Sequence, residues 1–257
     1  MTSIARVESG CPPREDFRGS SPKAVTPAEG YERWAPNYDR DPNPLLAREE
    51  RYLTPLLSRL RDRRALDLAC GTGRWLTKLV EGGAVGMGID LSLAMLHMAK
   101  AKPAASRLAA ADCECLPCRR GAFDLAICSF ALGHISNLDA MASELARVTR
   151  AGADVYISEL HPDSIAHGWR VGFRDHAAAV QIKTIARPVL EIVDTFCAHE
   201  FECVYCEELK LGEPEMPLFE IAGKIGSYAT AKQIPAVLIC HFKRRPAQSH
   251  CNTAHVE

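Results

Sequence analysis

The chain has 257 residues, of which 47% are hydrophobic and 25% are charged, as in an ordinary globular protein. Its formal net charge of -1 excludes a strong overall attraction to nucleic acid or to an anionic membrane. No apolar run approaches the roughly 20 residues that a membrane-spanning helix needs, and the N-terminus lacks the basic and apolar regions of a signal peptide.

The two ends of the chain differ from its middle. Residues 1–27 combine prolines with scattered serine and glycine and show no hydrophobic periodicity, which predicts a flexible N-terminal arm. Residues 246–257 are polar and predict a flexible tail. We therefore expect one domain over residues 28–245, in which residues 28–62 form a helical cover.

Strand-like and helix-like segments alternate through the middle of the chain. Short apolar runs predict strands over residues 65–69, 85–89, 108–111, 123–129 and 154–159. The segments between them predict helices over residues 74–81, 92–100 and 138–149, the last of which we expect to begin at a capping box of Ser136 and Asp139. This alternation predicts right-handed βαβ units and a parallel sheet with helices on both faces.

The C-terminal third has a different pattern. Apolar residues at helical spacing from Val189 to Phe196 predict a helix. Residues 202–207 and 236–243 are strand-like with no helical pattern between them, which predicts an antiparallel pair at the edge of the sheet. We expect the two long excursions, residues 161–185 and 211–232, to cover a substrate.

The most informative segment runs from Ala65 to Gly73 and reads Ala-Leu-Asp-Leu-Ala-Cys-Gly-Thr-Gly, a strand followed by a Gly-x-Gly turn. Gly71 and Gly73 remove side chains where the backbone must approach a ligand closely, and the N–H groups at the start of the next helix face that ligand. Asp90 ends the following strand, where a carboxylate can accept both hydroxyls of a ribose. This spacing predicts an adenosine-type ligand at the carboxyl end of the sheet.

One position distinguishes between possible cofactors. The dinucleotide fingerprint requires a third glycine three residues after the second, and Leu76 stands there. The sequence therefore disfavours a nicotinamide-dependent oxidoreductase.

Several segments, in order along the chain, resemble the motifs of class I (Rossmann-like) S-adenosylmethionine-dependent methyltransferases of the small-molecule type. They are Asp67-x-x-Cys-Gly-Thr-Gly73, Gly88-Ile-Asp-Leu-Ser-x-x-Met95, Ala111-Asp-Cys113 with Leu116-Pro117, Phe123-Asp-Leu125 through Phe130, and residues 144–152. The resemblance implies a Rossmann-like, doubly wound α/β fold with a seven-stranded sheet, mostly parallel with an antiparallel last strand. It also implies S-adenosyl-L-methionine as the cofactor. The residues expected to bind it are Asp67, Ala69, Cys70, Gly71, Thr72, Gly73, Asp90, Leu91, Met95, Asp112, Cys113, Ser129, Phe130 and Tyr38.

Two histidines follow strands on the ligand side of the predicted sheet. His134 comes after the fourth strand and His161 after the fifth. A histidine there can hold a nucleophile and accept its proton, so both are candidate catalytic residues. The alternative for His134 is a helix-start histidine bonded to backbone.

Aromatic side chains provide the candidate substrate contacts. Tyr31 and Trp34 share one face of a short N-terminal helix with Tyr38, a face that either packs on the core or covers the cofactor. Trp169 and Phe173 lie in the first excursion and suit an apolar or aromatic acceptor. The four candidate substrate residues are thus Tyr31, Trp34, Trp169 and Phe173.

The eleven cysteines favour reduced, buried thiols over a disulfide framework. Cys113, Cys115 and Cys118 lack the usual paired zinc spacing, and a fourth ligand is not evident. In Cys203-Val-Tyr-Cys206, strand alternation places the two cysteines on opposite faces. We therefore expect no metal site.

Together these features predict a cytoplasmic enzyme that transfers a methyl group to an O, N or C atom of a small metabolite or natural product by in-line displacement. We expect a monomer or homodimer with a small-molecule substrate and with neither nucleic acid nor membrane as a partner. A non-catalytic protein that binds S-adenosylmethionine or a metabolite remains the main alternative, because no catalytic group is obligatory for this reaction.

Overall fold

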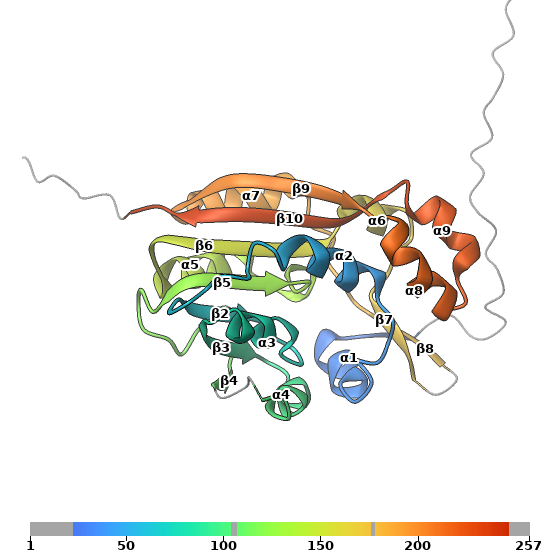
Figure 1. Ribbon diagram of the computed structural model, residues 1–257, viewed down its shortest axis with the longest axis horizontal. Coiled ribbons are helices and arrows are strands. Elements are labelled where there is room, and N and C mark those ends of the chain that lie inside the picture. The colour runs from blue at the N-terminus through green and yellow to red at the C-terminus, as the bar shows by residue number, and fades with distance from the viewer. Residues whose placement is uncertain (1–22, 104–106, 176–177, 247–257) are drawn as a thin grey trace, which may run out of the picture.

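The computed structural model describes residues 23–103, 107–175 and 178–246 (Figure 1). The predicted tail and most of the predicted arm lie outside the described residues. The prediction that the arm reaches residue 27 is wrong, because Lys23–Val25 form strand β1 and Thr26 caps the first helix. Within the part of the chain that the structure describes, no helix is long and apolar enough to cross a membrane.

Seven strands form the main sheet in the order β4-β3-β2-β5-β6-β10-β9. The parallel strands are β2 (Arg64–Leu68), β3 (Val85–Asp90), β4 (Leu108–Ala110), β5 (Phe123–Ser129) and β6 (Thr149–Leu160). β10 (Pro235–Arg244) runs antiparallel to both β6 and β9 (Phe201–Lys210). The predicted Rossmann-like sheet, mostly parallel with an antiparallel last strand, is confirmed. Its strand order reverses between β2 and β5, the point at which open α/β sheets bind ligands.

Alternation of side chains along the central strands divides the core into two layers. Leu66 and Leu68 of β2 belong to a buried cluster with α5 (Leu138–Val148) and α7 (Val189–Ala198). Ala65 of the same strand belongs to a second cluster with α2 (Pro44–Leu53) and α3 (Arg74–Glu81). α4 (Leu93–Lys100) packs beside β3 and β4. The helices predicted between the strands are therefore present, and they cover both faces of the sheet as expected.

The start of α5 differs from the prediction. Asn137, and not Ser136, caps the helix, since its side chain accepts the N–H of Ala140 at 3.0 Å. The Ser136 hydroxyl instead donates to Glu114 at 3.2 Å. The capping box of Ser136 and Asp139 is therefore wrong, and this end of α5 is joined to the loop that follows β4.

The first excursion folds into a second, three-stranded sheet that the sequence did not predict (Figure 1). After α6 (Pro162–Ala166), β7 (Gly172–Asp175) pairs antiparallel with β8 (Ala178–Ile182), and β8 pairs parallel with β1. α1 (Pro27–Trp34) packs on this sheet, with Trp34 and Phe173 stacked at 5.1 Å between ring centroids. The first excursion thus holds α1 in place.

The second excursion contains a 3-10 turn η2 (Glu213–Glu215), α8 (Met216–Ile221) and α9 (Ile225–Ala231). The buried Glu215 accepts from Arg51 of α2 at 2.9 Å, and Phe219 and Tyr228 join the buried cluster around α2. This excursion therefore packs against the N-terminal helical cover.

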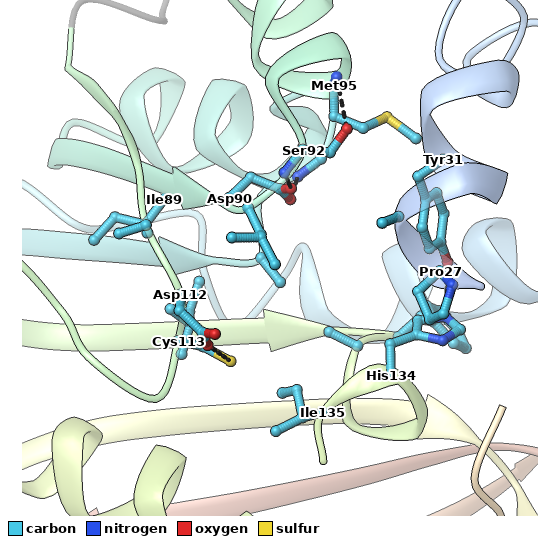
Figure 2. A pocket seen from close by; sticks show the side chains of 18 of the residues that line it. Pro27, Tyr31, Ile89, Asp90, Ser92, Met95, Asp112, Cys113, His134 and Ile135 are labelled. Atoms are coloured by element: carbon cyan, nitrogen blue, oxygen red, sulfur yellow. Dashed lines mark hydrogen bonds between the residues drawn. The ribbon is translucent and has the colours of Figure 1, made fainter. Parts of the chain in front are cut away.

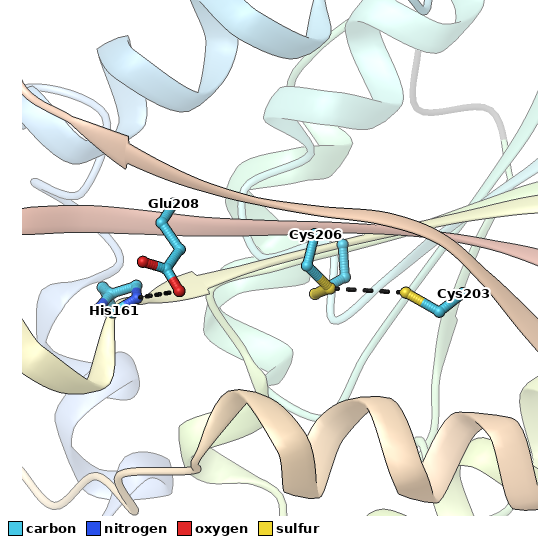
Figure 3. The surroundings of a disulfide bond; sticks show 5 residues. His161, Cys203, Cys206 and Glu208 are labelled. Atoms are coloured by element: carbon cyan, nitrogen blue, oxygen red, sulfur yellow. Dashed lines mark hydrogen bonds and ion pairs between the residues drawn. A yellow bond between two sulfur atoms is a disulfide. The ribbon is translucent and has the colours of Figure 1, made fainter.

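The edge pair β9–β10 carries a disulfide that contradicts the expectation of reduced thiols throughout. Cys206 and Cys240 are directly paired across the strands, with Cα atoms 4.1 Å apart, and are joined by a disulfide (Figure 3). The opposite-face prediction for Cys203 is also wrong, because its Sγ lies 3.8 Å from that of Cys206. The register shifts between His241 and Phe242, so Val204 is an extra bulged residue that brings both cysteines to one face.

A cluster of basic side chains surrounds Asp154 near the start of β6. Its carboxylate accepts from Arg63 and Lys243 at 2.8 Å each and from His241 at 3.0 Å. Burial raises the pKa of this carboxyl, but the three hydrogen bonds outweigh burial and hold the pKa well below its usual range. The cluster joins β6 and β10 to the segment before β2.

Candidate active site

The carboxyl ends of β2, β3 and β5 and the loop after β4 surround a cavity of about 490 Å³ (Figure 2). α1 contributes Pro27, Ala28 and Tyr31 to its wall. The cavity lies at the reversal of strand order and has a volume within the range of ~300–1,000 Å³ typical of small-molecule sites. Of the residues predicted to bind a cofactor, its wall includes Tyr38, Ala69, Gly71, Asp90, Leu91, Met95, Asp112, Cys113, Ser129 and Phe130.

Left-handed backbone brings the strand ends close to the cavity. Gly71 has φ of 53°, and a Cβ built on it meets no atom within 4 Å, so its backbone faces open space. Ala69 and Phe130 also have positive φ, 55° and 51°, although neither is glycine. Such strained positions gather at ligand sites. Sequence reasoning missed these two conformations, because alanine and phenylalanine give no signal for them.

The Asp90 carboxylate is held at the end of β3. Its two oxygens accept the N–H groups of Gly71 and Ser92 at 2.7 and 2.8 Å. Burial raises the pKa of Asp90, and these backbone hydrogen bonds oppose that rise. Each carboxylate oxygen keeps a further lone pair, so the group can still accept hydroxyl hydrogens from a ligand.

The end of the cavity farthest from Tyr31 combines apolar and polar side chains. Figure 2 shows Ile89, Asp112 and Cys113 gathered at one end of the cavity, away from Tyr31 and His134. Burial raises the pKa of the Cys113 thiol to about 12, so this thiol behaves as a weakly polar wall group.

Two predicted cofactor residues, Asp67 and Cys70, lie behind the cavity wall. The buried Asp67 accepts the N–H of Leu76 at 2.7 Å, and burial raises its pKa to about 7. Cys70 is buried against β3, and a side chain at Gly88 would place its Cβ only 2.9 Å from the Sγ of Cys70. Both residues therefore fix the turn from the inside.

Thr72 and Gly73 likewise stand outside the cavity lining. The Thr72 hydroxyl donates to Asp39 at 2.6 Å, and Asp39 forms an ion pair with Lys102 at 2.8 Å. A Cβ on Gly73 would lie 3.3 Å from Ala99, so this glycine permits close packing of α4. These contacts position the turn.

His134 belongs to the 3-10 turn η1 (Leu132–His134) and lines the cavity beside Tyr31. Its Nδ1 lies 3.3 Å from the carbonyl oxygen of Lys183, which can only accept, so Nδ1 carries the proton. Nε2 is then the acceptor of the Tyr31 hydroxyl at 2.9 Å. Burial lowers the pKa of His134 and raises that of Tyr31, which keeps both side chains neutral around pH 7.

A buried acid that the sequence did not reveal holds η1 in place. Glu159, at the end of β6, accepts the N–H groups of Gly133 and Leu160 at 3.0 and 2.9 Å. Burial raises its pKa to about 7. Glu159 does not line the cavity, and it acts on the site only by fixing the turn that carries His134.

A second buried acid that the sequence did not reveal is Glu49 of α2, which is fully buried beside the start of α3. It accepts from Arg74, from Trp75 Nε1 at 3.2 Å and from the hydroxyl of Ser129 at 2.7 Å, and the Ser158 hydroxyl also donates to it. Ser129 lines the cavity, so Glu49 connects the helical cover to the site wall.

The other candidates from the sequence lie away from the cavity. His161 is buried at the N-terminus of α6, accepts the N–H of Asp163 at 3.2 Å and faces Glu208 of β9 (Figure 3). Trp34 and Phe173 are stacked between α1 and the second sheet, and Trp169 packs against the cluster around α2. Of the proposed substrate contacts, Tyr31 alone lines the cavity.

The cysteines after β4 do not converge. Cys113 lines the cavity, Cys115 is exposed, and Cys118 has its sulfur 4.0 Å from that of Met87. Among the described residues, no group of three or more histidine, cysteine or acidic side chains is arranged to hold a metal ion.

The part of the chain that forms most of this site matches a known protein family. Residues 65–152 match the family model described as a methyltransferase domain, a range that contains the Gly71 turn and the ends of β3, β4 and β5. Over these residues the chain resembles a methyltransferase domain. The matched range supplies most of the cavity lining, His134 included, while α1 and the second sheet lie outside it.

Curated relatives share sequence with the chain, and a solved structure shares its fold. The chain resembles a malonyl-[acyl-carrier protein] O-methyltransferase of Pseudescherichia vulneris, 35% identical over 54% of this chain and 55% of that protein. It also resembles a demethylmenaquinone methyltransferase of Streptomyces avermitilis, 37% identical over 38% of this chain and 43% of that protein. The chain therefore spans about half the length of the curated relatives it matches. A solved S-adenosylmethionine-dependent methyltransferase from Mesorhizobium loti shares the fold, with a TM-score of 0.61 and 21% identity over 76% of this chain and 97% of that one.

The residues around the cavity fit S-adenosylmethionine. The open space at Gly71 permits a ligand to approach the backbone, and Asp90 keeps lone pairs for ribose hydroxyls. Ile89, Leu91 and Met95 supply apolar surface suited to an adenine ring.

Proposed function

We propose that this protein transfers a methyl group from S-adenosylmethionine to an O, N or C atom of a small-molecule acceptor. The observation that carries the proposal is that one cavity joins the Gly71–Asp90 turn to the hydrogen-bonded pair Tyr31–His134. A cofactor site and a proton-accepting pair in one enclosed space are what an acceptor with an acidic hydrogen requires.

In this proposal the cofactor would be held by Gly71, Asp90, Asp112 and Cys113. When bound, S-adenosylmethionine supplies an electrophilic methyl group on a sulfonium. The cavity walls align the acceptor and exclude water, and alignment alone can contribute roughly 7–11 kcal/mol. Glu159 positions η1 and with it the imidazole of His134.

Proton transfer is assigned to the pair Tyr31–His134. The Tyr31 hydroxyl already donates to Nε2 of His134, so its oxygen can take up a proton from the acceptor as its own proton passes to Nε2. A base of this kind contributes roughly 10²–10⁴-fold to the rate. The lowered pKa of His134 leaves Nε2 free of a proton at neutral pH and therefore able to accept one.

The test is transfer of label from methyl-labelled S-adenosylmethionine to a small-molecule extract. Wild-type protein is expected to move the label into a small product, and His134→Ala protein is expected to do so at least a hundredfold more slowly. Asp139→Asn, on the exposed surface of α5, is the matched control. Label that stays in the cofactor with every fraction of the extract would contradict the proposal and favour a binding protein.

A further inference from the structure

The half of the cavity formed by α1 and η1 lacks the positive charge that a site for an anion normally has. Glu32 of α1 and Glu114, which accepts from Ser136, belong to the lining, and Figure 2 shows Asp112 at the end away from Tyr31 with Asp90 between them. Among the described residues, neither lysine nor arginine lines the cavity. Carboxylates in proteins are normally recognised by arginine or lysine, whose charge offsets their loss of water.

The basic side chains around the cavity are already engaged. Arg33 pairs with Asp175 at 2.6 Å, and Lys102 pairs with Asp39 at 2.8 Å. Arg187 pairs with Glu191 at 2.5 Å and donates to the carbonyl oxygens of η1 and the residue after it. None of these cations is in the lining, so the cavity keeps an excess of acidic groups.

The side-chain protons of three polar residues on this half are already used within the protein. The Tyr31 hydroxyl proton is used on Nε2 of His134, and the Nδ1 proton of His134 is used on the carbonyl of Lys183. The Ser136 hydroxyl donates to Glu114. Tyr31 Oη keeps a lone pair that can accept a hydrogen bond, and Ala28, Phe130 and Ile135 add apolar surface to the same lining.

We propose that the acceptor is an uncharged, largely apolar molecule that presents one hydroxyl or N–H hydrogen to Tyr31 Oη, and that this half of the cavity excludes carboxylate acceptors. The inference rests on the proposed function and narrows its substrate class. It distinguishes this chain from the malonyl-[acyl-carrier protein] O-methyltransferase that it resembles, because a malonyl group carries a carboxylate. A carboxylate here would lack a cationic partner, lie close to acidic groups and be partly removed from water.

The direct test compares two probes of the same shape. 2-Naphthol is neutral at pH 7.5 and donates a hydroxyl hydrogen, whereas 2-naphthoate is an anion. Calorimetric titration of protein saturated with S-adenosylhomocysteine is expected to give at least tenfold tighter binding of 2-naphthol. Equal affinities, tighter binding of 2-naphthoate, or no binding of 2-naphthol would overturn the proposal.

A gain-of-binding variant gives an independent readout. Ala28→Lys adds one cation to the exposed part of the wall, and it is expected to raise the affinity for 2-naphthoate at least fivefold relative to that for 2-naphthol. Ala222→Lys, exposed at the end of α8, is the matched control and is expected to change neither affinity. A fivefold gain in both variants, or in neither, would contradict the assigned charge selectivity.

Labelled product from the transfer assay tests the same inference by chemistry. Mild alkali releases methanol from a methyl ester but leaves ethers, amines and C-methyl groups intact. Label that resists alkali supports an acceptor without a carboxylate, and release of labelled methanol overturns the inference while leaving the proposed methyl transfer intact. Failure of the protein to bind S-adenosylhomocysteine would instead contradict the proposed function itself.

Discussion

Replacing Glu49 by glutamine tests whether the buried carboxylate holds the helical cover onto the sheet. Glu49 is 0% exposed and accepts hydrogen bonds from Arg74, Trp75, Ser129 and Ser158. Glutamine keeps one acceptor oxygen but removes the buried countercharge of Arg74, whose guanidinium keeps only the more exposed Glu50 at 3.5 Å. Breaking a buried pair in this way typically costs about 3–5 kcal/mol of the free energy of unfolding.

The neighbouring residue provides the control. The Glu50 side chain is 38% exposed and pairs with Lys78 at 2.9 Å and with Arg74 at 3.5 Å. Because solvent screens such pairs, Glu50→Gln should cost less than about 1 kcal/mol. Urea unfolding at pH 7 measures both values. If the two variants lost equal stability, the buried network around Glu49 would not be what anchors α2.

Three further predictions concern other parts of the molecule. His134→Ala should lower kcat by about 10²–10⁴-fold and leave the calorimetric affinity for S-adenosylhomocysteine within twofold; a parallel loss of affinity would mean that His134 serves the cofactor. Cys240→Ser should lower the free energy of unfolding by about 2–4 kcal/mol relative to Cys197→Ser, a free thiol on α7; an equal effect, or no disulfide by mass spectrometry, would refute the cross-strand link. Asp154→Asn should remove stability that wild-type protein has above pH ~4 and loses as pH falls, because the folded-state pKa of this acid lies below its unfolded value; unfolding curves from pH 3 to 7 would contradict this if both proteins changed in parallel.

The parts of the fold that the sequence predicts are those with local signals. The strands near Leu66 and Ile127 are short, mainly apolar runs of the kind that a sheet buried on both faces requires; Gly71 follows the first within three residues, and Ser129 ends the second. The cavity beside Gly71 and Asp90 follows from the same pattern, because the carboxyl ends of parallel strands meet at one edge.

The parts that the sequence misses depend on contacts between distant segments. Glu49 and Glu50 are adjacent acids in one helix, and only the packing of α2 on β5 and β6 decides which of them is buried. The second sheet joins residues 23–25 to residues 172–182 through strands of three to five residues, too short to give a periodic signal. Val204 inserts one bulged residue, and that single insertion changes which face Cys203 occupies.

The same limit explains why the sequence does not distinguish the two candidate histidines. His134 and His161 both follow strands that end at the ligand side, so their sequence positions are equivalent. The structure distinguishes them through neighbours, since the ring of His134 meets Tyr31 in the cavity whereas that of His161 caps α6.

Calorimetric titration with S-adenosylhomocysteine tests most directly whether the turn at Gly71 and the acid at Asp90 bind the adenosyl group. The wild-type protein should bind one equivalent. Asp90→Asn should weaken binding at least tenfold, because one charged acceptor of about 1.5–3 kcal/mol is lost. Absence of binding to the wild-type protein, or unchanged affinity in Asp90→Asn, would contradict this account of the site.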